Sequence, residues 1–230
     1  MSGVDVEAEF GPRLSATVVM ATSEDDGFPA SALERHTART RGWHTSKMPE
    51  FPVELGFAFD GLAEVRCLRL LAHESKIPNK VDLFVFTPTD EQVQAKQYPP
   101  FEQADFRRLG YLSFVQNEAR NFSARELKTV RIKARVLYLK LVVRGCHSNG
   151  VNLFNQAGLV GCDFHGQLLA PYGKSARQAI LGLPVDSSID AEVELTDLTP
   201  AKVPSSASGT TRAAAPPASG AASSAVPSAQ

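Results

Sequence analysis

Cys146 and His147 are adjacent in the sequence, and such a pair could form a nucleophilic dyad. That chemistry needs a thiol with a lowered pKa in an electropositive, partly exposed setting, and a third group that orients the histidine. Cys146 ends an apolar run, and the sequence marks no third group beside the pair. The pattern therefore favours a structural thiol over a cysteine- or histidine-based hydrolase, and we predict no catalytic residue.

Metal ligands are also sparse. Glu24, Asp25 and Asp26 form an acidic loop whose oxygens could contact Ca²⁺, but residues 34–42 (ERHTARTRG) are basic where further ligands would be needed. The five histidines are scattered and lack the spacing of a zinc site. We therefore predict no metal and no other cofactor. The acidic loop is interpreted as a solvated turn in which Gly27 supplies a positive φ.

Residues suited to recognition include an arginine pair between two aromatic residues. Arg107 and Arg108 follow Phe106 and precede Tyr111. Neighbours in a strand point to opposite faces, so we expect at least one of the arginines to reach solvent. An exposed arginine beside Tyr111 has the composition of an interface hot spot.

An amide-rich loop supplies the other candidates. Short amides usually cap turns through side-chain-to-backbone hydrogen bonds. A loop at one end of a β-sandwich is also where such folds place a recognition surface. The candidate partner-binding residues are Arg107, Arg108, Tyr111, Asn149, Asn152 and Asn155.

Trp43 is the only tryptophan, and it could stack on a ligand as in carbohydrate-binding sandwiches. A single tryptophan in a β-sandwich is more often a core or rim anchor. We therefore predict that Trp43 lies in the core.

Short strands are the elements that would position these residues. In residues 53–60, apolar and other residues alternate with period two, which predicts one buried and one exposed face. Residues 88–100 are polar and are interpreted as a surface excursion. Seven or eight short strands with turns between them predict an all-β, antiparallel β-sandwich or jelly roll. The further strands are expected at residues 17–22, 64–73, 81–87, 106–115, 127–134, 138–144 and 158–164. The expected core positions are Leu55, Phe57, Leu83, Val85, Leu139 and Leu141.

Composition excludes several classes of protein. The formal net charge of -1 gives no electrostatic case for binding nucleic acid or an anionic membrane, and no apolar run is long enough for a membrane span. The N-terminus does not have the pattern of a signal peptide. Three scattered cysteines, Cys67, Cys146 and Cys162, fit reduced thiols in the cytosol better than a disulfide framework.

The chain divides into one domain and flanking segments. We expect residues 1–16 to be a flexible leader and residues 17–168 to be the jelly-roll sandwich. Residues 169–202 are expected to form a C-terminal extension, in which residues 175–181 could form a short helix. Residues 203–230 are almost entirely Ala, Ser, Pro, Gly and Thr, which predicts a disordered linker.

Several dense runs resemble a known family. They are LLAH at residues 70–73, FRRLGY at 106–111, ARELKTV at 124–130, YLKL at 138–141, VNLFNQAGLVG at 151–161, and DDGF at 25–28. In these runs the chain resembles the N-terminal domain of the family of the centrosomal protein of 104 kDa, a flagellar associated protein of the ciliary tip. The matches are collinear from about residue 17 to 166. The resemblance implies a discoidin-like, galactose-binding-like jelly roll.

The resemblance also implies a function. It suggests a non-enzymatic protein-interaction module of a centriolar and ciliary-tip microtubule-associated protein, located in the cytoplasm and cytoskeleton, at the cilium or flagellum tip and at the basal body or centriole. Its partners would be proteins of the ciliary tip or centriole. Family members contact microtubules mainly through further regions, including a tubulin-binding array, that this sequence lacks. The alternative is a small-ligand module for a glycan or lipid headgroup, which an aromatic pair over a groove with an Asp or Arg would favour.

Overall fold

A computed structural model describes residues 5–35, 37 and 39–172. Its strands are β1 (Arg13–Leu14), β2 (Ala16–Ala21), β3 (Trp43–His44), β4 (Val53–Ala72), β5 (Pro78–Phe86), β6 (Arg107–Ser113), β7 (Leu127–Cys146) and β8 (Gly158–Pro171). The helices are α1 (Val6–Phe10) and α2 (Asp90–Ala95), and the 3₁₀ turns are η1 (Ala30–Leu33), η2 (Phe101–Gln103) and η3 (Glu118–Arg120). None of the helices in these residues is long and apolar enough to cross a membrane.

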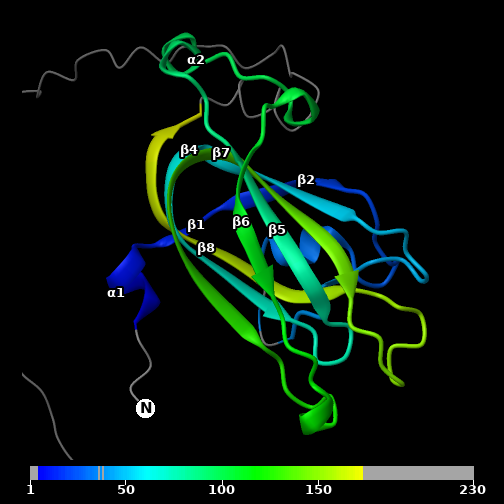
Figure 1. The fold of residues 1–230 in the computed structure, drawn as a ribbon. Coiled ribbons are helices and arrows are strands. Elements are labelled where there is room, and N and C mark those ends of the chain that lie inside the picture. The colour runs from blue at the N-terminus through cyan, green and yellow to red at the C-terminus, as the bar shows by residue number, and fades with distance from the viewer. Residues whose placement is uncertain (1–4, 36, 38, 173–230) are drawn as a thin grey trace, which may run out of the picture. The chain divides into compact units, whose positions relative to one another are not determined.

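All strand pairs are antiparallel, and they form one 8-stranded sheet that curls into a two-layer sandwich (Figure 1). The strand order is β1-β8-β4-β7-β5-β6, with β2 paired to β4 and β3 paired to β8. The predicted all-β, antiparallel fold is therefore confirmed.

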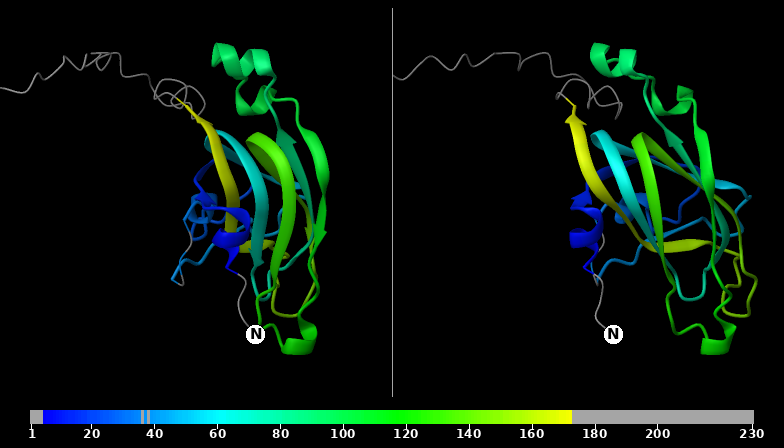
Figure 2. Two further views of the ribbon diagram at one scale, coloured as in Figure 1. Left: turned by 90° about the vertical axis from the view of Figure 1, so that its left-hand side faces the viewer. Right: turned by 60° about the vertical axis from the view of Figure 1, so that its left-hand side comes forward.

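Two long strands connect the layers. The first half of β4 pairs with β2 and with the second half of β7, whereas its second half pairs with β8 and with the first half of β7. The register shifts between Ala58 and Ala63, where β4 bends. A Cβ added at Gly61 in this bend would lie 2.1 Å from the carbonyl oxygen of Ala170, so only glycine fits there. Figure 2 shows the resulting curvature of the long strands.

The core lies between the two layers. All six residues expected in it are buried, with relative exposures from 0% to 3%: Leu55, Phe57, Leu83, Val85, Leu139 and Leu141. Trp43 is 0% exposed, and its indole N–H donates to the carbonyl of Ser23 at 3.0 Å. The prediction that Trp43 is a core residue is therefore confirmed.

The excursion between β5 and β6 covers part of the outer face of the sheet. Phe101 packs in a second apolar cluster with Phe86 and Tyr138, and the Tyr138 hydroxyl donates to the carbonyl of Pro99 at 2.9 Å. The Phe101 ring lies so close to Gly56 that an added Cβ would be 2.3 Å from it. Residues 88–100 are thus more than a polar surface loop, because they lead Phe101 onto the sheet.

The N-terminal boundary differs from the prediction of a flexible leader through residue 16. The Asp5 side chain caps α1, and Phe10 at the end of α1 is 9% exposed. Strand β1 follows and pairs with β8, with Leu14 opposite Phe164. Tertiary contacts of the two apolar side chains Phe10 and Leu14 therefore hold this segment against the sandwich.

At the other end of the domain, β8 continues to Pro171, beyond the predicted boundary at residue 168. The predicted helix at residues 175–181, most of the C-terminal extension and the linker at residues 203–230 lie outside the described residues.

Candidate interaction surface

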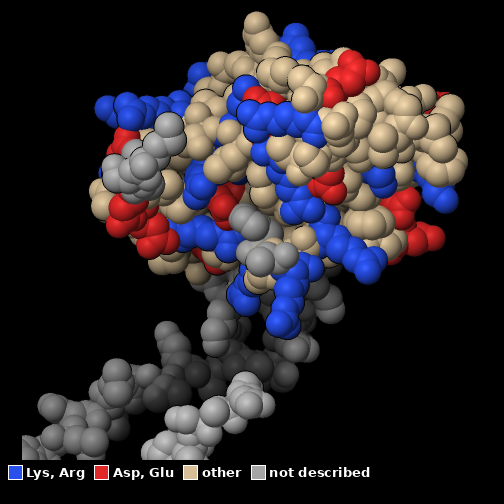
Figure 3. All heavy atoms as spheres, turned by 90° about the horizontal axis from the view of Figure 1, so that it is seen from below, with Lys and Arg blue, Asp and Glu red and all other residues tan. Residues whose placement is uncertain are grey.

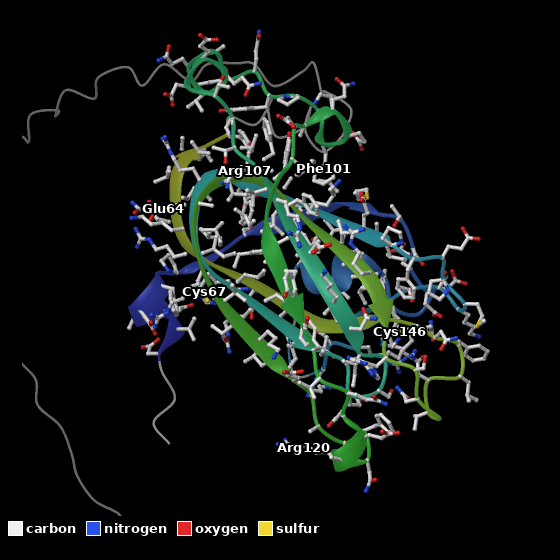
Figure 4. All side chains as sticks on the ribbon, in the orientation of Figure 1. Glu64, Cys67, Phe101, Arg107, Arg120 and Cys146 are labelled. Atoms are coloured by element: carbon white, nitrogen blue, oxygen red, sulfur yellow. The ribbon has the colours of Figure 1, made fainter. Side chains whose placement is uncertain are left out.

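Arg107 and Arg108 lie on β6, the last strand in the sheet order, which pairs with β5 alone within the described residues. Arg107 is opposite Val85 and Arg108 is opposite Phe84, so the two arginines lie on different faces of the strand. Both are exposed, which confirms that at least one reaches solvent. Figure 4 shows Arg107 near the upper end of β6, close to Phe101.

Arg108 is ordered by a buried carboxylate. The Asp82 side chain is 3% exposed; it accepts from Arg108 Nη2 at 2.6 Å and from Arg144 Nε at 2.5 Å. Burial alone would raise the pKa of Asp82, but the hydrogen bonds from the two arginines outweigh it, and the pKa is lowered. Asp82 therefore stays ionised and holds both guanidinium groups against the sheet.

Aromatic and cationic side chains surround this pair. Tyr111 is opposite Asp82 and is 58% exposed, and Lys80 Nζ lies 4.6 Å from the centroid of its ring. Lys140 lies 4.8 Å from the ring of Phe106 and forms an ion pair with Glu54 at 3.3 Å. We call this outer surface the basic–aromatic face; it consists of Lys80, Arg108, Tyr111, Lys140 and Arg144. Its four cations exceed the two carboxylates, Asp82 and Glu54, that they contact.

The three candidate asparagines mainly stabilise their loop. Asn149 Oδ1 accepts from the backbone N–H of Val151 and Asn152, at 3.1 and 2.8 Å. Asn152 is 3% exposed and bridges both backbone groups of Gln156, at 2.8 and 3.0 Å. Asn155 has a positive φ of 48°. These amides cap turns, the default that the sequence indicated.

The same loop instead exposes apolar side chains, which the sequence analysis missed. Val151, Leu153 and Phe154 are 62%, 75% and 46% exposed. Met48 on a neighbouring loop is 64% exposed, and its N–H donates to the carbonyl of Phe154 at 2.9 Å. The sequence did carry a sign of this surface, because Val151, Leu153 and Phe154 are apolar residues within an amide-rich loop.

Cys146 and His147 do not form an activated pair. The Cys146 thiol donates to the carbonyl of Asn155 at 3.1 Å, and burial raises the pKa of this thiol. His147 Nε2 contacts the carbonyl of Phe114 at 2.8 Å, so it carries the proton of that hydrogen bond. The thiol is thus structural, as the sequence indicated, and the histidine holds a neighbouring loop.

The acidic loop is used for local structure. Glu24 accepts from the N–H of Ala30 at 2.9 Å, and Asp25 accepts from the N–H of Gly27 and from the amide of Gln156. The expectation that Gly27 supplies a positive φ is wrong, because Gly27 is not among the glycines with positive φ. Within the described residues, no group of three His, Cys, Asp or Glu side chains could hold a metal ion.

Comparison with known proteins gives a consistent result. Residues 42–166 match the family model described as Centrosomal protein CEP104, N-terminal domain. The chain is 34% identical over 154 residues to Centrosomal protein of 104 kDa from Mus musculus, an alignment that covers 67% of this chain and 16% of the relative. The corresponding protein of Homo sapiens is 32% identical over the same length, with the same coverage. The chain thus spans about a sixth of the length of these relatives.

Solved structures share the fold at lower identity. CBM32-3 from a family 31 glycoside hydrolase of Clostridium perfringens has a TM-score of 0.53 and 17% identity, covering 71% of this chain and 99% of that chain. The N-terminal domain of the single-strand break repair protein XRCC1 has a TM-score of 0.51 and 18% identity, covering 67% and 99%. These discoidin-like jelly rolls confirm the predicted fold class, and at such identities the likeness concerns the fold alone.

Proposed function

This chain belongs to the family of the centrosomal protein CEP104 N-terminal domain, and we propose from this premise that it is a non-enzymatic protein-interaction module. It would serve a centriolar and ciliary-tip microtubule-associated protein and support organisation of the cilium tip. Its partners would be proteins of the ciliary tip or centriole. The chain spans about a sixth of the length of its relatives. We propose that the microtubule contact of such a protein is made mainly by other regions.

The observation that carries the proposal is the basic–aromatic face beside the outer strand β6. Asp82 fixes Arg108 and Arg144, so little side-chain entropy remains to be lost when a partner binds. Tyr111 adds an exposed aromatic ring, and Arg107 lies on the other side of the same strand. Tyrosine and arginine are the residue types that most often dominate interface energy.

The alternative function, a glycan or lipid-headgroup module, is disfavoured because Trp43 is not available to stack on a ligand. Such a module needs an exposed aromatic face, and the only tryptophan, Trp43, is 0% exposed. A hydrolase based on Cys146 and His147 is disfavoured as well, because each side chain forms a hydrogen bond with a backbone carbonyl and not with the other.

The test is charge reversal at Arg107 in a full-length family protein expressed in ciliated cells. Arg107→Glu should weaken capture of ciliary-tip proteins and tip localisation at least about tenfold, while the free energy of unfolding changes by less than about 0.5 kcal/mol. Arg108→Glu is a poorer choice because it would place a carboxylate beside Asp82. Arg107 lies on the other side of β6, so Tyr111→Ala is the variant that tests the basic–aromatic face itself, and it should weaken capture and localisation as well.

The matched control is Lys133→Glu, an exposed charge reversal on the first half of β7, away from this face. It should leave both capture and localisation unchanged. Equal loss in the control, or normal localisation after deletion of the whole sandwich, would remove the adaptor role from this surface.

A further inference from the structure

A pocket of about 420 Å³ is lined largely by the segment that connects β6 to β7. Figure 1 shows this segment at the lower end of the molecule. Its apolar lining consists of Ala72, Ile77, Val115, Ala119, Ala124 and Leu127. Val115 and Leu127 remain 67% and 45% exposed. This volume is within the range of about 300–1,000 Å³ typical of ligand sites.

Hydrogen bonds hold the walls of the pocket in place. The Asn117 side chain donates to the carbonyls of Glu74, at 3.2 Å, and of Ala124. Glu126 Oε2 accepts from the N–H of Val115 at 2.8 Å, which closes the segment on itself. The pocket is therefore formed before a ligand arrives, and binding has little ordering cost.

Two of the three charged residues that line the pocket form ion pairs. Arg125 pairs with Glu74 at 2.7 Å, and Glu126 pairs with Lys128 at 2.6 Å. The Arg120 side chain also lines the pocket, yet it makes no ion pair or hydrogen bond with any residue that the structure describes. Figure 4 shows Arg120 on η3 at the lower tip, and Figure 3 shows Lys and Arg side chains gathered across this end. The pocket thus combines apolar walls with one unmatched cation.

We propose that this pocket binds a peptide segment of a protein partner, in which an aliphatic side chain adjoins a carboxylate. The aliphatic group would fill the space between Val115, Ala124 and Leu127, and the carboxylate would pair with Arg120. The carboxylate comes either from an Asp or Glu side chain or from a chain end. Among the described residues the lining contains no Phe, Tyr or Trp, and His73 supplies its only ring, so it lacks the large aromatic face of a sugar site.

This site is separate from the basic–aromatic face, and it goes beyond the adaptor role proposed above. Arg107 and Arg120 lie at opposite ends of the molecule in Figure 4. A partner could therefore occupy the pocket whether or not β6 and its neighbours bind another protein.

The experiment is a titration followed by ¹H–¹⁵N NMR, with the whole chain and short capped Gly/Ser peptides that carry a central Leu-Asp pair. Peptides with Leu-Lys or Ser-Asp in place of Leu-Asp test the carboxylate and the aliphatic group. A Gly/Ser peptide ending in leucine with a free carboxylate separates a chain end from a side chain. We expect shifts at the amides around Ala72, Val115 and Arg120, and at least about tenfold weaker binding by the two altered peptides.

Two variants test the pocket directly. Arg120→Ala should weaken the Leu-Asp peptide about tenfold, and Ala119→Trp, which fills the mouth of the pocket, should abolish binding. Both residues are exposed, and the dispersed spectrum of each variant reports whether the fold is kept. Arg107→Glu is the matched control and should bind the peptide as the unaltered chain does.

The outcomes are decisive in either direction. Equal binding of the Leu-Lys peptide, shifts away from the pocket, or unchanged affinity of Arg120→Ala would overturn the proposal. Pocket shifts produced by galactose, but not by the Leu-Asp peptide, would identify a glycan site instead. Loss of ciliary partner capture in Arg107→Glu with intact peptide binding would leave both proposals standing, because each variant then affects its own surface.

Discussion

His44 is a buried histidine whose surroundings disfavour its protonated form. It is 2% exposed, and its ring stacks on Phe28 with centroids 3.8 Å apart. Lys76 Nζ lies 2.8 Å from His44 Nδ1, so the lysine donates to a neutral ring that carries its proton on Nε2. Burial, followed by the charges of Lys76 and His73, lowers the pKa of His44 to about 3.

This arrangement predicts a loss of stability in mild acid. In the unfolded chain a histidine binds a proton below about pH 6.5, whereas folded His44 does so only near pH 3. Between these values the unfolded state binds more protons, so the free energy of unfolding falls as the pH falls, by up to about 1.4 kcal/mol per pH unit. Urea unfolding at several values between about pH 7.5 and 5 would measure this slope above the range in which carboxylates titrate.

His44→Phe is the variant that assigns the slope. It keeps a ring against Phe28 and removes the titrating group, so the dependence on pH should flatten. Part of it should remain, because burial also lowers the pKa of His73. An unaltered slope in His44→Phe would show that another group carries the effect.

At the scale of single residues, the sequence predicted burial well and contacts poorly. Alternation identified Leu55 and Leu139 as core positions, because every second side chain of a strand faces the same layer. It could not show that the rings of His44 and His73 lie 4.7 Å apart, since they come from different strand ends. The contacts of Arg108 and Arg144 with Asp82 could not be predicted for the same reason.

At the scale of elements, the loop between β7 and β8 depends on one buried amide. Asn152→Ala would leave the N–H and the carbonyl of Gln156 without their side-chain partners. The expected cost is about 1–3 kcal/mol of unfolding free energy for each buried group left unsatisfied. Thermal or urea unfolding measures this loss.

Asn155→Gly is the control in the same loop. Glycine adopts the φ of 48° found at Asn155 without steric cost, so its stability should stay close to that of the unaltered chain. Equal stability of Asn152→Ala and Asn155→Gly would mean that Asn152 does not hold the loop.

The strand pattern explains why two long strands were predicted as four short ones. Alternation in β4 stops near Gly61 because the register shifts there, although the backbone continues into the other layer. In β7 the adjacent residues Leu137, Tyr138 and Leu139 are all 0% exposed, because Phe101 and its neighbours cover the outer face. A period-two pattern appears only where one face of the strand is exposed to solvent. Neither the register shift in β4 nor the covering of β7 can be predicted from the residues of the strand itself.

At the scale of the whole molecule, composition and alternation predicted the sandwich, and the sequence runs that resemble the family agreed with this prediction. The start of the domain was placed too late. In residues 5–10 acidic and apolar residues alternate, and the placement of this segment depends on where Phe10 and the following strand dock. Such long-range contacts leave no pattern in the neighbouring sequence. The N-terminal boundary of the domain could therefore not be predicted without the structure.

The N-terminal segment should therefore contribute measurably to stability. Removing residues 1–15 deletes Phe10 and Leu14, which are 9% and 8% exposed, and the ion pair of Arg13 with Asp163 at 2.7 Å. It also leaves the edge of β8 without β1. Burial of two apolar side chains predicts a loss of at least about 2 kcal/mol. For a domain of this size that corresponds to a drop in Tm of roughly 4–8 °C, measurable by calorimetry.

Removal of residues 203–230 is the matched truncation. This segment is nearly all Ala, Ser, Pro, Gly and Thr, and we propose that it is a linker outside the folded domain. Its removal should leave Tm unchanged, because a linker contributes no burial to the sandwich. If the N-terminal truncation also left Tm unchanged, α1 and β1 would be dispensable, and the folded domain would start near residue 17 as the sequence alone indicated.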